Sequence, residues 1–319
     1  MSFDGAKFVW MNGEIIPWEQ ATVHVMSHAL HYGSSVFEGI RVYKTPNGPQ
    51  VFRLTDHIQR LYDSAKIYRM PIDYARDELV QACKDLVVAN KLIDGAYIRP
   101  IAFRGLGEAG LAPKDDHRVD VAITAWKWGS YLGAEGLEQG VDVSISSWQR
   151  TAPNTIPAMA KAGGNYLSGQ LISGEAKRLG FAEGIALSTD GTISEGAGEN
   201  VFIVKDGKIV TPPSSSSILS GLTRDTVIKL ASRLNITVEE KAVPREALYL
   251  ADEIFFTGTA AEVTPVRSVD RIEVGPGHRG PITLQLQDAF FGLFSGETKD
   301  DEGWLESVES GTVVETSSD

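Results

Sequence analysis

The sequence predicts a mixed α/β protein of the α+β kind, divided into two domains. Its 319 residues exceed the usual size of one domain and suffice for a sizeable buried core. Segments of strand character alternate with segments whose apolar residues recur at helical spacing. Residues 129–136 carry three glycines and no clear period, which is typical of a connection between domains. We therefore predict a small N-terminal domain (1–128), an interdomain loop (129–139), a large C-terminal domain (140–310) and a disordered tail (311–319).

The elements of the two domains follow from the spacing of apolar residues. In the first domain we predict strands in 8–17 and 36–53, amphipathic helices in 56–68 and 78–90, and strands again in 96–103 and 119–126. In the second we predict a strand in 141–147, a helix in 166–179, strands in 184–188 and 253–256, and a hairpin that joins 201–204 to 208–210. The Asp206-Gly207 pair is typical of a two-residue hairpin turn.

Charge and cysteine content narrow the class of protein. The formal net charge of -12 argues against nucleic acid or an anionic membrane as a partner. The single cysteine, Cys83, falls in the apolar pattern of a predicted helix and is expected to be a reduced core residue. No run approaches ~18 apolar residues and the N-terminal segment lacks an apolar signal core, so we expect a cytoplasmic protein.

Lys161 is the first candidate catalytic residue. It lies among small, uncharged residues in Ala158-Met159-Ala160-Lys161-Ala162-Gly163-Gly164, and Tyr166 follows five places on. In a dry pocket the ammonium form is disfavoured, so the amine becomes a nucleophile that can form a Schiff base with an aldehyde such as pyridoxal phosphate. Taken alone, a lysine in this setting is more often an ordinary loop residue.

Two further kinds of motif would serve such a cofactor. The loop Ile193-Ser194-Glu195-Gly196-Ala197-Gly198-Glu199-Asn200 offers two acids, and a carboxylate against the pyridine nitrogen keeps that nitrogen protonated. Gly221-Leu222-Thr223 opens a predicted helix whose N–H groups suit a phosphate, and Gly258-Thr259-Ala260 is a glycine turn at a strand end. Taken alone, the acidic loop is better explained as a solvated turn, and the segment that opens the helix as a helix cap.

Together and in this order, the motifs resemble those of the fold-type-IV pyridoxal-phosphate aminotransferases, and in particular the bacterial branched-chain amino acid aminotransferases. The resemblance covers about residues 8–306 and implies the two-domain architecture of that fold type, with pyridoxal 5′-phosphate as the cofactor and no metal. Other segments that carry it are 23–33, 36–41, 96–100, 152–157 and 290–294.

The resemblance assigns the cofactor contacts. Lys161 would hold the cofactor covalently and then move the proton between the substrate's Cα and the cofactor. Tyr166 would hydrogen-bond the phenolic oxygen, and Glu195 rather than Glu199 would meet the pyridine nitrogen. The implied phosphate ligands are Arg60, Leu222, Thr223 and Thr259.

Substrate recognition must accept both an apolar side chain and the charged side chain of glutamate. Tyr97 and Arg99 are two apart on a predicted strand, so both point to one face. The resemblance implies that Tyr97 holds the α-carboxylate together with the Thr259 and Ala260 N–H groups, and that Arg99 and Tyr32 meet the glutamate side chain. The implied apolar walls are Phe37, Trp128 and Tyr131. In this family Tyr32 comes from the neighbouring subunit, which implies at least a homodimer and leaves a trimer of dimers open.

We therefore predict transamination between the branched-chain L-amino acids leucine, isoleucine and valine and 2-oxoglutarate, giving branched-chain 2-oxo acids and L-glutamate. A D-amino-acid aminotransferase or an aminodeoxychorismate lyase of the same fold would share Lys161 and Glu195 but lack this set of substrate residues. A non-catalytic pyridoxal-phosphate-binding protein and a phosphate-binding module without cofactor are alternatives of other classes.

Overall fold

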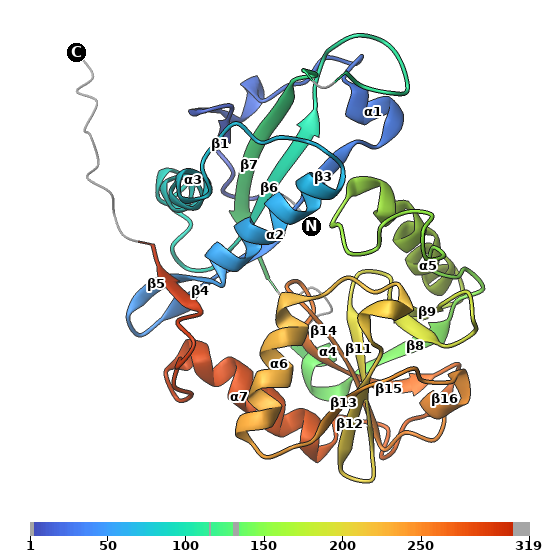
Figure 1. Cartoon of the computed structure of the whole chain (residues 1–319). Helices are drawn as coiled ribbons and strands as arrows, with labels where there is room; N and C mark the ends of the chain where they lie inside the picture. Colours follow the sequence, from blue (N-terminus) through green and yellow to red (C-terminus); the bar gives the residue numbers. More distant parts are fainter. Residues whose placement is uncertain (1–2, 115, 130–133, 309–319) are drawn as a thin grey trace. The chain divides into compact units, whose positions relative to one another are not determined.

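The computed structural model describes residues 3–114, 116–129 and 134–308, which fall into two compact units (Figure 1). The first unit comprises Met1–Trp128 with Asp300–Asp319, and the second comprises Gly129–Lys299. Each unit is a sheet with helices packed on it, which confirms the predicted mixed α/β class.

The division of the chain differs from the predicted one in two places. Residues 300–308 return to the first unit, where β17 (Leu305–Ser307) pairs with β5 (Gly48–Phe52). Part of the predicted interdomain loop is a helix of the second unit, α4 (Ala134–Gln139). Both elements are too short to show a period in the sequence. The predicted tail, 311–319, lies outside the described residues.

The first unit is built on an eight-stranded sheet whose pairings are antiparallel. The strand order is β17-β5-β4-β6-β7-β1-β2, and β3 pairs with β6. The remaining bounds are β1 (Phe8–Met11), β2 (Glu14–Pro17), β3 (Ser35–Phe37), β4 (Ile40–Thr45), β6 (Ala96–Arg104) and β7 (Val119–Lys127). Because β6 has strands on both sides, its side chains project from an inner strand of the sheet.

Two long helices cover this sheet, and a short one precedes β3. Their bounds are α1 (His28–Tyr32), α2 (Leu54–Ile67) and α3 (Arg76–Ala89). Leu54, Ile58 and Leu61 recur at helical spacing on α2 and are fully buried, which is the amphipathic pattern predicted for this segment. Cys83 of α3 is a free, fully buried thiol, and burial raises its pKa well above the usual range.

The second unit is built on a nine-stranded mixed sheet. The order is β10-β9-β8-β15-β14-β11-β12-β13, β16 pairs with β15, and three joins are parallel: β8 with β9, β8 with β15, and β12 with β13. The bounds are β8 (Val141–Ile145), β9 (Glu183–Leu187), β10 (Ile193–Gly196), β11 (Asn200–Lys205), β12 (Lys208–Thr211), β13 (Val238–Glu240), β14 (Glu253–Gly258), β15 (Glu262–Val269) and β16 (Ile272–Glu273). Asp206 and Gly207, with φ of 50° and 74°, make the predicted turn between β11 and β12.

Four helices accompany the second sheet. Besides α4, these are α5 (Tyr166–Arg178) on β9, α6 (Leu222–Arg233) on β14, and α7 (Pro281–Ser295) on β14 and β15. Buried apolar residues of the sheet, among them Val143, Ile185, Val201 and Phe256, form the core of this unit. In the described parts of both units, no helix is long and apolar enough to cross a membrane.

Candidate active site

Lys161 and Tyr166 lie side by side in the second unit. A short 3-10 turn (Gly163–Asn165) separates them, and Tyr166 is the first residue of α5. The turn folds the chain so that Lys161 Nζ donates a hydrogen bond to Tyr166 Oη at 2.6 Å. Asn165 is buried and donates from Nδ2 to the carbonyl oxygen of Ala160 at 2.9 Å, which fixes the segment that carries the lysine.

Glu195 of β10 is a buried carboxylate with partners on both oxygens. Its Oε1 forms an ion pair with Arg150 Nη2 at 2.9 Å, and its Oε2 accepts a hydrogen bond from the Leu219 N–H at 3.0 Å. Burial raises the pKa of Glu195, while the Arg150 guanidinium, the Leu219 N–H and the Lys161 ammonium act in the opposite direction. Glu195 therefore lies within electrostatic reach of Lys161.

Asn200 ties this carboxylate to the start of α6. Its Nδ2 donates to Glu195 Oε2 at 3.1 Å and to the Leu219 carbonyl oxygen at 2.9 Å. Gly221, the N-cap of α6, packs so closely that a Cβ there would overlap Asn200 Oδ1, so only glycine fits. Leu222 and Thr223 form the first turn of α6, where helix N–H groups and the helix dipole suit a phosphate.

The turn after β14 lies against the loop that precedes β11. The two strands are antiparallel with Asn200 opposite Thr257, so the residues just before β11 and just after β14 share one end of the sheet. A Cβ added at Gly258 would lie 3.8 Å from the Gly198 carbonyl oxygen. The half-buried residues that continue this turn are Thr259 and Ala260.

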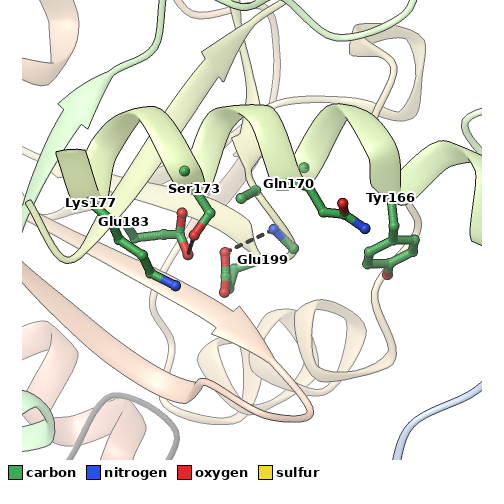
Figure 2. Close-up of a pocket in the computed structure, with 10 residues that line it drawn as sticks. Tyr166, Gln170, Ser173, Lys177, Glu183 and Glu199 are labelled. Carbon is green, nitrogen blue, oxygen red and sulfur yellow. Dashed lines mark hydrogen bonds between the residues drawn. The ribbon is translucent and has the colours of Figure 1, made fainter. Parts of the chain in front are cut away.

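A cavity of about 400 Å³ lies beside Tyr166, lined by one stripe of α5 and by Glu183 and Glu199 (Figure 2). Burial raises the pKa of Glu199 to about 8, and the neighbouring Glu183 carboxylate adds to this rise. Burial also raises the pKa of Glu183, which the Gly184 N–H and Lys177 partly offset. The protonated, neutral form of Glu199 is therefore favoured relative to that of an exposed glutamate.

Arg99 lies on a bed of aromatic rings in the first unit. Its guanidinium carbon is 4.9 Å from the centroid of Phe37 and 5.1 Å from that of Tyr97, and its Nη2 donates to Tyr97 Oη at 3.2 Å. The Tyr97 ring stacks on Trp128 with centroids 4.5 Å apart. Four of the predicted substrate residues thus form one cluster, because the alternation of β6 sends Tyr97 and Arg99 to the same face.

Tyr32, another aromatic residue predicted for substrate binding, belongs to a different element of the first unit. Tyr32 ends α1, where it is 48% exposed and has His28 and His31 as its described ring contacts. Tyr131 lies outside the described residues.

Arg60, the predicted phosphate ligand on α2, belongs to a buried charge cluster of the first unit. Its Nε donates to Glu38 Oε1 at 2.7 Å and its Nη2 to Glu38 Oε2 at 2.9 Å. His57 Nδ1 lies 2.7 Å from Glu38 Oε2. Burial acts to raise the pKa of Glu38, but Arg60 and His57 outweigh it and hold that pKa well below its usual range.

The sequence analysis did not single out four residues of these clusters. Glu38 and Asn200 lie inside motifs that it did quote, so a signal for them existed. Arg150 and His57 belong to no motif, and only the fold brings Arg150 to Glu195. In the described residues, no group of three or more His, Cys, Asp and Glu side chains could hold a metal ion.

Comparison with known proteins agrees with this geometry. Residues 35–269 match the family described as Amino-transferase class IV. The branched-chain-amino-acid aminotransferase of Escherichia coli (strain K12) is 59% identical over 308 residues, covering 97% of this chain and 99% of that protein. A crystal structure of the Escherichia coli enzyme gives a TM-score of 0.94 at 59% identity, covering 95% of this chain and 100% of that one. The branched-chain amino acid aminotransferase from Thermobaculum terrenum in PLP-form gives a TM-score of 0.89 at 39% identity, covering 97% and 100%. The second unit groups a lysine, a tyrosine, a buried acid and a helix N-terminus. Together with these matches, this shows that the chain belongs to the class IV aminotransferase family.

Proposed function

We propose that this protein is a pyridoxal-phosphate-dependent transaminase that exchanges an amino group between leucine, isoleucine or valine and 2-oxoglutarate. The observation that carries the proposal is Lys161, hydrogen-bonded to Tyr166 and within electrostatic reach of the buried Glu195. The matches to branched-chain enzymes over 97% of this chain supply the substrate class.

The residues of the second unit suit pyridoxal 5′-phosphate. Lys161 offers an amine for the aldehyde, and Tyr166 offers a phenol for the ring oxygen. Glu195, whose burial raises its pKa, is a carboxylate that gains from a cationic partner such as a protonated ring nitrogen. The first turn of α6, with Gly221 as N-cap, suits the phosphate, and Thr259 adds a hydroxyl.

The chain's own groups do the work of binding and proton transfer. When bound, pyridoxal phosphate supplies an aldehyde that takes up the substrate's amino group and a ring that withdraws electrons from the Cα–H bond. Lys161 Nζ would hold the aldehyde group of the cofactor, and its free amine would serve as the general base for the Cα proton. Tyr166, whose Oη is 2.6 Å from Nζ, would orient that amine. Glu195 would hold the ring nitrogen in its protonated form.

The first unit supplies the groups that distinguish the substrates. Arg99 presents a guanidinium to the side-chain carboxylate of glutamate, and the Phe37 and Trp128 rings present apolar surface to a branched side chain. Tyr97 binds the α-carboxylate with Thr259 and Ala260, and Arg60 adds to the phosphate ligands. Family membership and the grouping of Arg99, Phe37, Tyr97 and Trp128 support this part of the proposal.

We also propose that the protein is at least a homodimer in which Tyr32 serves the neighbouring subunit, and that Tyr131 belongs to the apolar wall with Phe37 and Trp128. The support is the family resemblance and the exposure of Tyr32, 48% within its own chain. Sedimentation of the purified protein measures the assembly. The cytoplasmic location and the lack of a nucleic-acid partner stay predictions.

The test combines labelling with turnover. Borohydride reduction of the purified protein followed by peptide mass spectrometry should find the pyridoxyl group on Lys161. Lys177 is the matched control, because it lines the cavity beside Tyr166 on the same helix. Lys161→Ala should abolish amino transfer from L-leucine to 2-oxoglutarate, whereas Lys177→Ala should retain it.

Three outcomes would contradict the proposal. A label on Lys177 would displace the assigned nucleophile. Turnover of D-amino acids in place of L-leucine would favour the D-amino-acid enzymes of the same fold. Visible absorbance without amino transfer would favour a binding protein.

A further inference from the structure

Arg150 is a buried charge that no sequence motif marks. It follows β8, and its backbone N–H donates to the Leu187 carbonyl oxygen of β9 at 2.9 Å, which anchors it beside the sheet. Only 8% of its side chain is exposed. Removing a guanidinium from water costs several kcal/mol unless strong partners offset the loss. A charge kept in such a place calls for a reason beyond packing.

The partners of this guanidinium are few. Its Nη2 lies 2.9 Å from Glu195 Oε1, whereas its buried Nε has no hydrogen-bond partner among the described residues. On the other side, Leu219 N–H and Asn200 Nδ2 hold Glu195 Oε2. Both oxygens of the carboxylate are therefore fixed. Of the three groups that contact them, Arg150 is the charged one, and the other two are neutral N–H donors.

A second acid in the same loop shows what happens without such a partner. Glu199 is as deeply buried as Glu195, with 6% and 5% of each residue exposed. Its described side-chain hydrogen bond comes from a backbone N–H, that of Gly198, at 3.0 Å. Burial and its neighbour Glu183 raise the pKa of Glu199 to about 8. The ion pair at 2.9 Å gives Glu195 a cationic partner that favours its ionised form, whereas the neighbouring Glu183 disfavours the ionised form of Glu199.

We propose that Arg150 is a positioning residue that keeps Glu195 ionised and oriented, so that the proton shared between this carboxylate and the cofactor's ring nitrogen resides on the ring. The inference rests on the proposed function. A positive charge next to Oε1 stabilises the carboxylate more than it disfavours the more distant ring cation, so it shifts the proton from Glu195 to the ring. Arginine suits this task because its guanidinium keeps its charge in a dry site where a lysine readily loses it.

The experiment reads the proton directly. Protein loaded with pyridoxal phosphate that carries ¹⁵N in the ring reports protonation of the ring nitrogen through its ¹⁵N NMR shift. We expect the protonated shift in wild type, movement toward the unprotonated shift in Arg150→Gln, and partial recovery in Arg150→Lys. The leucine half-reaction of Arg150→Gln, measured in a single turnover, should slow about 10- to 100-fold. The matched control is Arg267→Gln, which removes a guanidinium from a bidentate pair with Asp142 in the same unit and should change neither reading.

A double-mutant cycle separates positioning from a purely structural role. If Arg150 acts through Glu195, Arg150→Gln should add no more than about a twofold loss in a Glu195→Gln background. This comparison also holds if Arg150→Gln alone fails to fold, because the double variant leaves neither a buried acid nor a buried guanidinium alone.

Two results would overturn the inference: an unchanged ¹⁵N shift in Arg150→Gln, or a further tenfold loss in the Glu195→Gln background. A wild-type protein that shows neither a ring ¹⁵N signal nor amino transfer would instead contradict the proposed function.

Discussion

Each unit contains a buried ion pair between a glutamate and an arginine, and the two pairs affect the glutamate differently. In the first unit, Glu38 receives two hydrogen bonds from Arg60 and a third contact from His57. In the second unit, Glu195 forms an ion pair with Arg150 and accepts two hydrogen bonds, from Asn200 Nδ2 and the Leu219 N–H. Two basic side chains serve the first carboxylate, and one serves the second.

The pKa values follow this difference. That of Glu38 is held well below its usual range, whereas that of Glu195 stays raised, because burial outweighs a single guanidinium. Glu38 is thus a fully neutralised acid that orients an arginine. Glu195 has one cationic neighbour, so its carboxylate can still interact favourably with a further cation. The number of cations around the buried carboxylate thus distinguishes Glu38 from Glu195, the acid proposed to meet the cofactor.

The largest expected effect is that of Glu195→Gln, which removes the carboxylate of the second pair. The amide keeps the shape but can no longer hold a proton on the ring nitrogen, so transamination should fall about 10³- to 10⁴-fold, as when an orienting carboxylate of an active site becomes its amide. Cofactor absorbance should persist, and single-turnover spectra with leucine measure the rate. Glu199→Gln is the control from the same loop. A large loss in Glu199→Gln with none in Glu195→Gln would reverse the assignment.

Glu38→Gln should act on stability instead. It leaves the Arg60 and His57 side chains without their buried anion, which costs about 3–5 kcal/mol of unfolding free energy. Denaturant unfolding of the cofactor-free protein measures this loss. Since the folded-state pKa of Glu38 is depressed, its contribution is present above the unfolded value of 4.5 and is lost as the pH falls further. Asp94→Asn, in the exposed pair with Lys44, should change little; a similar loss there would refute the assignment.

Arg99→Met tests whether Arg99, which lies against aromatic rings, interacts only with substrates whose side chain is charged. A charge-assisted hydrogen bond is worth roughly 1.5–3 kcal/mol, so kcat/KM for the glutamate half-reaction should fall about one to two decades. The leucine half-reaction should be nearly unchanged, whereas Tyr97→Phe should slow both. Equal losses with leucine and glutamate in Arg99→Met would assign Arg99 to the common α-carboxylate or to the fold.

The last expected effect concerns Glu199, whose described side-chain hydrogen bond comes from the Gly198 N–H. Its pKa is about 8 in the folded protein and 4.5 when unfolded, so the folded state binds the proton more tightly and stability falls as the pH rises between these values. Glu199→Gln should flatten this decline and unfold at a higher temperature than wild type at pH 8.5, where the buried carboxylate is most costly. Thermal unfolding at pH 6 and 8.5 measures it. A decline as steep in Glu199→Gln as in wild type would place the titrating group elsewhere, and Glu239→Gln on the surface serves as control.

The fold was predictable where periods are long or turns distinctive. The helices α2, α3 and α5 and the Asp206-Gly207 hairpin lie where the sequence analysis placed them, because each has a strong apolar period or a specific turn pair. Short elements such as α1, α4 and β17 were not predicted, since three to six residues show no period.

The motif residues of the candidate site could be predicted from the sequence, but the residues that contact and orient them could not. Lys161, Tyr166 and Glu195 stand in recognisable segments, and the structure gathers them in one unit. Arg150 and His57 reach their glutamates only through tertiary packing, so no local pattern could reveal them. The family resemblance favoured Glu195 over Glu199, and the two equally buried acids differ in their partners, which a sequence does not show.

The return of the chain to the first unit has a consequence for biosynthesis. The second unit is one continuous stretch, whereas the first receives its edge strand β17 only after that whole stretch has been made. While the ribosome is still at work, the second unit can fold to completion, but β5 keeps an open edge until residues 305–307 emerge. An open strand edge is a template for pairing with other chains. Truncation after Lys299 should therefore leave a complete second unit attached to a first unit prone to aggregation, so that translational stalling late in the message is the most hazardous for this protein.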